Sequence, residues 1–224
     1  MGIPICRFMV SGGGEKGDQM SLEGGTLFDL TEHLSQQSPG HLDLFASLTD
    51  DQFQLAIDAL LNKALSGLEE IKKGLQSLDE PTLSGLLRLA MITTGLSVSL
   101  EQYSNGHADL TIESYRLGMA RRILGEAKIH DGPKYHIDGV KQLLGYMTGR
   151  ELRGLMLVYM RKANGSGLMK KVRDTMDDEK PAHQQGLTTP HAIRWAFDSN
   201  HLHSCGDNIR VSHVTCNLYV DGST

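Results

Sequence analysis

Hydrophobic residues recur at helical spacing through most of residues 26–100, which predicts a series of amphipathic helices. The clearest helix is expected after Thr49, an N-cap residue that is followed by two aspartates and then by apolar residues at steps of three and four. Those apolar residues are Phe53, Ile57, Leu60, Leu61, Leu65, Leu68, Ile71 and Leu75. The next segment, 83–100, follows Pro81 and is apolar almost all round, as expected for a helix in the middle of a bundle.

The second half of the chain shows the same period, and we expect further helices at about residues 110–128, 137–147, 148–163 and 167–176. Strand signals are nearly absent before residues 209–220, where the pattern alternates and is rich in β-branched residues. The predicted fold class is therefore all-α, with two packed multi-helix subdomains and a short extended C-terminal tail. The predicted boundaries are a flexible leader at 1–25, an acidic helical subdomain at 26–104, a basic helical subdomain at 105–178, and a tail at 179–224 with a helix and one candidate strand.

Charge is distributed unevenly, although the net charge of the chain is only −5. Residues 111–173 contain 13 Lys and Arg against 5 Asp and Glu, whereas residues 20–110 contain 4 and 13. A helical stripe of apolar residues at 152–160 would place Arg150, Arg153 and Arg161 together on the opposite face. Several helices would then carry unmatched cations, which predicts a surface for a polyanion. The residues expected to bind lipid or another polyanion are Arg121, Arg122, Lys128, Arg150, Arg153, Arg161, Lys162, Lys170, Lys171 and Arg173.

The charge pattern leaves the nature of the polyanion open. Anionic lipid would attract such a surface, and so would nucleic acid, although aromatic residues for stacking on single strands are scarce. A third partner is a second copy of the chain, because the acidic first half of one copy could contact the basic half of the next and build a head-to-tail polymer.

Candidate chemistry is sparse. The chain has no phosphate-binding glycine loop, no serine-nucleophile motif and no zinc-protease motif, and no catalytic constellation is found, so we expect neither enzymatic activity nor a cofactor. No metal site is expected either, since the only clustered soft ligands lack the spacing of a zinc knuckle. Those weak candidates are His201, His203, Cys205, His213 and Cys216. No window is long and apolar enough to span a membrane, and three distant cysteines fit a reducing compartment.

Several segments resemble the matrix proteins of influenza-type orthomyxoviruses. The segment from Met20 reads MSLEGGTLFDLTEHL and is similar to the start of that family, and residues 154–172 read GLMLVYMRKANGSGLMKKV and resemble its late helix, turn and next helix. Arg121 and Arg122 stand where the family has an arginine-rich run, and residues 131–144 resemble the turn and helix after it. The chain departs from the family at 144–148, which is not basic, and at 174–183, where only His183 remains of the Cys/His group.

The resemblance implies a structural protein from a distant genus, with two helical subdomains that polymerise beneath a viral envelope. Its expected partners are an anionic membrane, further copies of itself, the viral ribonucleoprotein and RNA. Its expected locations are the virion interior, the host cytoplasm, the inner face of the plasma membrane and the nucleus. Two alternatives stay open from the sequence: a viral RNA-binding nucleoprotein or cofactor, which the same basic surface would serve, and a cellular helical adaptor.

Overall fold

The computed structural model describes residues 26–37, 39–93, 95–100, 102–103, 107–116 and 118–222. The predicted leader at 1–25 lies outside the described residues. The helices are α1 (Leu27–Gln37), α2 (Pro39–Ala46), α3 (Asp50–Glu70), the 3-10 helix η1 (Lys72–Leu75), α4 (Glu80–Met91), α5 (Pro133–Tyr146) and α6 (Gly165–Glu179). The predicted N-cap of α3 is confirmed, because the Thr49 hydroxyl accepts a hydrogen bond from the backbone N–H of Gln52 in a capping box.

A seven-stranded mixed sheet forms the centre of the molecule, and the prediction of an all-α fold is therefore wrong. Its strands lie in the order β1 (Ser97–Ser99), β4 (Leu110–Arg116), β5 (Met119–Ile129), β6 (Arg153–Met160), β9 (Asn208–Asn217), β8 (Phe197–Leu202) and β7 (Thr189–Pro190). The pairs β5–β6 and β6–β9 are parallel, and the other pairs are antiparallel. A separate short hairpin joins β2 (Gln102–Tyr103) to β3 (His107–Ala108).

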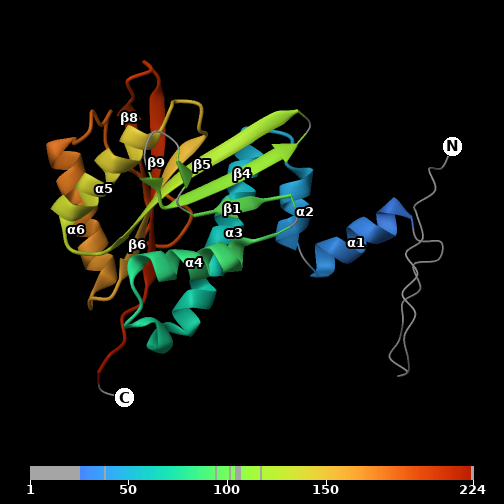
Figure 1. The fold of residues 1–224 in the computed structure, drawn as a ribbon, viewed down its shortest axis with the longest axis horizontal. Coiled ribbons are helices and arrows are strands. Elements are labelled where there is room, and N and C mark those ends of the chain that lie inside the picture. Colours follow the sequence, from blue (N-terminus) through green and yellow to red (C-terminus); the bar gives the residue numbers. More distant parts are fainter. Residues whose placement is uncertain are drawn as a thin grey trace.

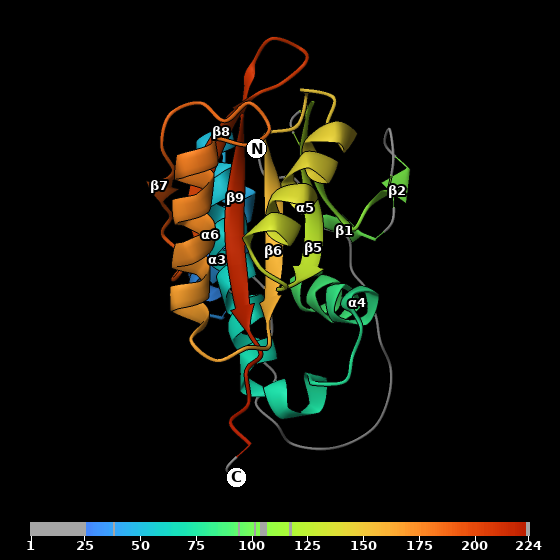
Figure 2. The same ribbon diagram turned by 90° about the vertical axis from the view of Figure 1, so that its left-hand side faces the viewer.

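Helices cover both faces of the sheet, as Figure 2 shows, with α5 and α6 in front and α3 behind. Alternate residues of β6 divide between the two faces. Leu155, Leu157 and Tyr159 belong to the core cluster formed with α3 and α4. Met156 belongs to a cluster with α5, and Val158 and Met160 belong to one with α5 and α6. Every residue of β6 is buried, which explains why its sequence reads as a continuous apolar run.

Burial on both faces is the physical reason for the wrong fold prediction. A short apolar run cannot be told from a buried helix by its period alone. Residues 110–128, expected to form a helix, fold as the β4–β5 hairpin, and residues 148–163 supply β6. The strand expected at 209–220 corresponds to β9, which lies inside the sheet and not in a separate tail.

The ends of the parallel strands β5, β6 and β9 form one edge of the sheet, which differs from the edges formed by the outer strands β1 and β7. The three strands run in the same direction and end there, where α4 also lies (Figure 2). The helix α5 begins at Pro133, shortly after β5 ends, and α6 begins at Gly165, shortly after β6 ends. The N-terminal ends of α5 and α6 therefore lie at the edge where β5 and β6 end, and the partial positive charge of such ends favours anionic ligands. At the opposite side of the molecule, α1 extends from α2 away from the sheet (Figure 1).

Candidate active site

Two carboxylates accept hydrogen bonds from backbone N–H groups near the end of β5, beyond the residues of β5 that pair with β4. The pairing of β4 with β5 begins at Leu110 opposite Gly125, so the following N–H groups of β5 have no partner in β4. The N–H of Ala127 instead donates to Asp109 Oδ2 at 2.9 Å, and the N–H of Ile129 donates to Glu80 Oε2 at 2.8 Å. Asp109 lies just before β4 and Glu80 opens α4, so segments distant in sequence meet at this point.

Glu126 and Lys128 lie close to these two carboxylates. Successive residues of a strand point to opposite faces, so Glu126 and Lys128 project from the same face of β5. The Lys128 Nζ atom lies 2.6 Å from Glu126 Oε1 and 3.5 Å from Glu80 Oε1. The exposed fractions of the side chains rise from 4% for Glu126 through 14% for Lys128 to 24% for Glu80. The group therefore reaches from the interior to the surface.

The electrostatics of Glu126 differ from those of an ordinary surface carboxylate. Its pKa is raised to about 7: burial is the largest cause, the negative charges of Asp109 and Glu80 act in the same direction, and the hydrogen bond and charge of the Lys128 ammonium oppose them. Burial opposes the charge of Lys128, but the three carboxylates together hold its pKa above the ordinary value. Glu126 Oε2 is buried and has no hydrogen-bond partner among the described residues. An unpaired buried carboxylate oxygen is unfavourable unless a cation or proton completes it.

A small pocket opens beside this group. It has a volume of about 40 Å³ and is lined by Glu80, Pro81, Ser84, Leu100 and Asp109. A water molecule needs roughly 10–15 Å³ of such space, so the pocket has room for a water or a small ion between the carboxylates of Glu80 and Asp109. Behind it, the hydroxyl groups of Ser84 and the buried Tyr159 lie 3.4 Å apart.

The donor set fits a hard divalent cation better than a soft metal. Within the described part of the chain, no group of three or more His, Cys, Asp or Glu side chains forms a cage that could hold a metal ion. Mg²⁺ does not need such a cage, because it is usually held by one or two carboxylates and completes its shell with waters and substrate phosphates. Asp109 and Glu80 line the small pocket, and Glu126 Oε2 is a further carboxylate oxygen without a hydrogen-bond partner among the described residues.

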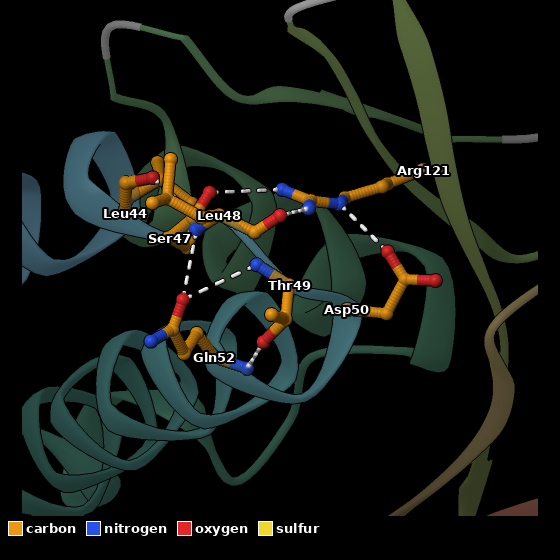
Figure 3. Close-up of polar contacts among 7 residues, drawn as sticks. All are labelled: Leu44, Ser47, Leu48, Thr49, Asp50, Gln52 and Arg121. Carbon is orange, nitrogen blue, oxygen red and sulfur yellow. Dashed lines mark hydrogen bonds and ion pairs between the residues drawn. The ribbon is translucent and has the colours of Figure 1, made fainter.

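The residues expected to bind a polyanion are dispersed, and several of them serve the fold. Arg121 is buried: its Nε lies 2.9 Å from Asp50 Oδ1, and its terminal nitrogens donate to the carbonyls of Ser47 (3.3 Å) and Leu48 (3.1 Å), as Figure 3 shows. Its guanidinium also stacks over the ring of Phe53. Arg121 thus links the β4–β5 hairpin to the start of α3, and its buried guanidinium does not form part of a polyanion-binding surface.

Three further arginines form ion pairs or hydrogen bonds within the protein. Arg153 is 1% exposed and pairs with Asp58, Arg161 donates to the carbonyls of Leu75 and Leu78, and Arg173 donates to Thr188. Arg150, Arg153 and Arg161 do not share a helical face, because this segment is a loop and a strand. Lys162 and Lys170 are exposed and pair with Asp131 and Asp174, and Lys171 is exposed. Lys128 is partly buried, with a side chain that is 14% exposed, and it is paired with Glu126 and Glu80.

The structure does bring Arg121, Arg122 and Arg150 to one place. They line a pocket of about 860 Å³ at the far end of the β4–β5 hairpin from Asp109 and Glu126. Glu113 pairs with Arg122 at 2.6 Å, and Glu151 also lines the pocket. Two of the three cations are thus matched by acids, so this pocket shows no concentrated positive charge.

We expect Arg121→Met to lower the free energy of unfolding by about 2 kcal/mol, because hydrogen bonds and ion pairs from a buried charged group are lost together. Arg122→Met is the matched control: it removes a partly exposed pair on the neighbouring residue and should cost less than about 1 kcal/mol. Urea denaturation of both variants measures the difference. Equal effects would contradict the structural role assigned to Arg121.

The five candidate metal ligands near the C-terminus do not come together as a site. His201 and His213 are fully buried and hydrogen-bond to Ser199. Cys216 is buried in the core cluster on the other face of the sheet, and His203 and Cys205 lie in the turn between β8 and β9. No zinc-like cluster occurs among the residues that the structure describes.

Sequence reasoning missed Glu80, Asp109 and Glu126. The available signal was a charged Glu-x-Lys pair at the end of the largely apolar run from Ile123 to Ile129, where a strand places both side chains on one face. Because this run was predicted to be a helix, Lys128 was assigned to a basic surface and Glu126 was assigned no role.

Comparison of the chain with protein-family models, with curated proteins and with solved structures gives no match. Among the described helices, none is long and apolar enough to cross a membrane. The function therefore has to be argued from the site itself.

Proposed function

We propose that this protein is a metal-dependent hydrolase that cleaves phosphodiester bonds in nucleic acid. The observation that carries the proposal is the buried Glu126–Lys128 pair, held beside Asp109 and Glu80 where the parallel strands end. Carboxylates from separate elements around one lysine, with an unpaired buried oxygen, favour a site at which one or two carboxylates and waters hold Mg²⁺ beside a phosphate group.

Each residue of the site has a separate role. Asp109 and Glu126 would hold the divalent ion, with Glu80 adjacent. When bound, such an ion polarises the phosphoryl oxygens and lowers the pKa of a coordinated water. Lys128 places an ammonium where negative charge builds up on the phosphate, and its raised pKa keeps it charged. The N-terminal ends of α5 and α6 add a favourable field for an anion at the same edge.

The shape of the site supports a polymer as the substrate. The pocket next to the carboxylates is about 40 Å³, far smaller than the roughly 300–1,000 Å³ that enclose a small organic ligand. A substrate must therefore lie across the surface and present one phosphate to the site. Nucleic acid does this, and the exposed Lys134 and Lys162 at this end of the sheet offer contacts to neighbouring phosphates.

The earlier expectation of a non-enzymatic matrix protein stays an untested prediction. Its structural premises have changed, because the helical bundle it assumed is a sheet with helices on both faces. The arginines expected to form its membrane-binding face are largely paired inside the protein. A hydrolytic site accounts for Glu126 and Lys128, which the matrix prediction leaves unexplained.

The direct test is cleavage of end-labelled single- and double-stranded DNA and RNA by the purified protein with Mg²⁺ or Mn²⁺. We expect fragments that accumulate with time and disappear when EDTA removes the metal. An absence of cleavage on all four substrates with both metals, or equal cleavage in EDTA, would contradict the proposal.

Metal binding should strengthen as pH rises through about 7. Glu126 has a pKa raised to about 7, so below that pH it carries a proton that a metal ion must displace. The apparent affinity for Mg²⁺ should fall up to about 10-fold for each pH unit below 7. The protonated carboxyl favours the folded state below the ordinary carboxyl pKa, and this contribution is lost as pH rises through 7. Mg²⁺ should accordingly raise the melting temperature more at pH 8 than at pH 6; an equal rise at both would contradict the role of Glu126.

A further inference from the structure

A chain of four buried side chains crosses the sheet on the face covered by α5 and α6. His136 of α5 contacts His213 of β9, with Nε2 and Nδ1 2.8 Å apart. His213 Nε2 lies 2.7 Å from Ser199 Oγ of β8, which lies 2.7 Å from His201 Nε2. His201 Nδ1 lies 3.0 Å from the carbonyl oxygen of Ala182. All four residues are at most 3% exposed, and the ring of Phe197 stacks on His213.

The carbonyl at one end fixes the direction of the hydrogen bonds along this chain, and that direction requires His213 and His201 to be neutral. The carbonyl of Ala182 can only accept, so His201 carries its proton on Nδ1 and accepts on Nε2. Ser199 then donates to His201 and accepts from the Nε2–H of His213. His213 in turn accepts on Nδ1 from the Nε2–H of His136. The geometry thus specifies the tautomer of each ring.

Among the described residues, no carboxylate forms an ion pair with His136, His201 or His213, and none is a cause of their pKa shifts. Around Phe197, β6 and α6 contribute apolar side chains, among them Val158, Met169 and Met176. The titratable neighbours are His130 beside His136 and His183 beside His201, and their positive charges would disfavour another. Burial lowers the pKa of His136 to about 3 and lowers those of His213 and His201 as well.

The hydrogen-bonded chain of His136, His213, Ser199 and His201 connects two segments to the sheet. Its first end is in α5, which packs against the site: a methyl group added at Gly139 would lie 3.4 Å from Lys128 Cγ. Its other end holds the segment after α6, where Lys180, Ala182 and His183 have φ values of 45°, 52° and 57°. Non-glycine residues rarely adopt this left-handed conformation, so the segment is strained and depends on contacts such as the one from His201.

We infer that the His136–His213–Ser199–His201 chain is an acid-sensitive latch, whose protonation releases α5 and the Pro181–Gln185 segment from the sheet. Charged rings are far more stable in water than in this interior, so acid favours the open state. The regulatory consequence rests on the proposed function: once α5 loosens, Lys128 loses the surface that holds its stem beside Glu126.

The direction of the pH dependence follows from linkage. Each histidine has a folded-state pKa below its ordinary value near 6.5, so the latch is fully closed above about pH 6.5 and weakens as pH falls towards the lowered pKa values. Each proton taken up on opening changes the opening equilibrium by about 10-fold per pH unit, and three protons by up to about 1,000-fold.

Hydrogen exchange and histidine NMR test the latch in the full-length protein. Corrected for intrinsic rates, the opening equilibrium of α5 and residues 181–185 should change little between pH 7.5 and pH 6.5 and should rise at least about 10-fold per pH unit from pH 6.5 to pH 5. The double variant His136→Phe/His213→Leu keeps the volume apolar and should lose this dependence in α5, while residues 181–185 should keep only the share of His201. His33→Asn, at an exposed position in α1, should behave like the parent protein.

The NMR arm needs no variant. In the parent protein, His136 and His213 should be neutral Nε2–H tautomers and His201 a neutral Nδ1–H tautomer at pH 6.5. A charged His213, different tautomers, or an unchanged pH dependence in a folded double variant would overturn the latch. Cleavage is scored separately: acid-dependent opening without cleavage at any pH supports the latch and counts against the proposed function. Cleavage lost in acid without opening overturns the latch and leaves the proposed function standing.

Discussion

Replacing Asp109 with asparagine should lower the rate of Mg²⁺-dependent cleavage by about 10²- to 10³-fold while the protein stays folded. Asparagine has nearly the same shape, and its carbonyl oxygen can still accept the hydrogen bond that Asp109 Oδ2 now accepts from Ala127 at 2.9 Å. The substitution therefore removes the negative charge and leaves the cap on the edge of β5. The measurement is the cleavage rate at saturating Mg²⁺ together with the melting temperature without metal.

Asp131→Asn is the matched control for this experiment. Asp131 lies at the same end of the sheet, between β5 and α5, but it is exposed and pairs with Lys162 at 3.0 Å. Its loss should change neither the cleavage rate nor the melting temperature by a measurable amount, because exposed pairs contribute little. Equal losses of activity in the two variants would show that general charge at this edge, and not a metal ligand, determines the rate.

The experiment also separates the two roles that the structure gives to these carboxylates. Asp109 and Glu80 satisfy N–H groups of β5 that β4 leaves unpaired, and this capping alone would justify a hydrogen-bond acceptor at both positions. Capping does not account for Glu126, whose Oε2 is buried without a partner among the described residues. A purely structural role therefore predicts full activity for Asp109→Asn, whereas a ligand role predicts its loss.

The helices that flank the sheet were largely predictable from the sequence, and the central strands were not. The period of three and four residues located α3, and Thr49 and Pro81 marked the starts of α3 and α4. The central strands are buried on both faces, which removes the alternation that identifies a strand at a surface. The predicted helix at 148–163 failed for this reason, since all eight residues of β6 are buried.

The candidate site was hidden by the same error. A lysine and a glutamate two residues apart lie on different sides of a helix but on the same side of a strand, so their meeting depends on the type of element. Glu80 and Asp109 come from other parts of the chain, and only the packing of α4 against the end of β5 brings them to Lys128. Local patterns do not encode such a contact.

Arginines inside a strand misled the charge argument in the same way. A count of cations predicts a basic surface only when the side chains are exposed. Arg153 begins β6 and is 1% exposed, and its charge is balanced within the fold by Asp58 of α3. The uneven distribution of charge along the chain thus partly reflects internal pairing between the acidic first half and the basic middle.

Removing the partner of Arg153 should be the most destabilising single change among the ion pairs. Arg153 donates to both carboxylate oxygens of Asp58, and His191 Nε2 lies 3.3 Å from Asp58 Oδ2. Burial opposes the charge of Asp58, but the hydrogen bonds from His191 and Arg153 hold its pKa below the ordinary value. We expect Asp58→Asn to lower the free energy of unfolding by about 3–5 kcal/mol, because Arg153 would remain charged in the interior without a counterion.

A double substitution distinguishes the loss of the Asp58–Arg153 attraction from the cost of leaving Arg153 charged and unpaired in the interior. Asp58→Asn combined with Arg153→Met removes both charges and should recover at least half of the lost stability, since a buried pair and an apolar replacement are often nearly equivalent. Asp43→Asn, at an exposed position in α2, controls for the loss of an aspartate and should lower the free energy of unfolding by less than about 0.5 kcal/mol. Guanidinium denaturation at neutral pH measures all three. If the double variant is as unstable as Asp58→Asn alone, Asp58 stabilises the fold through its other contacts, of which His191 is the nearest candidate.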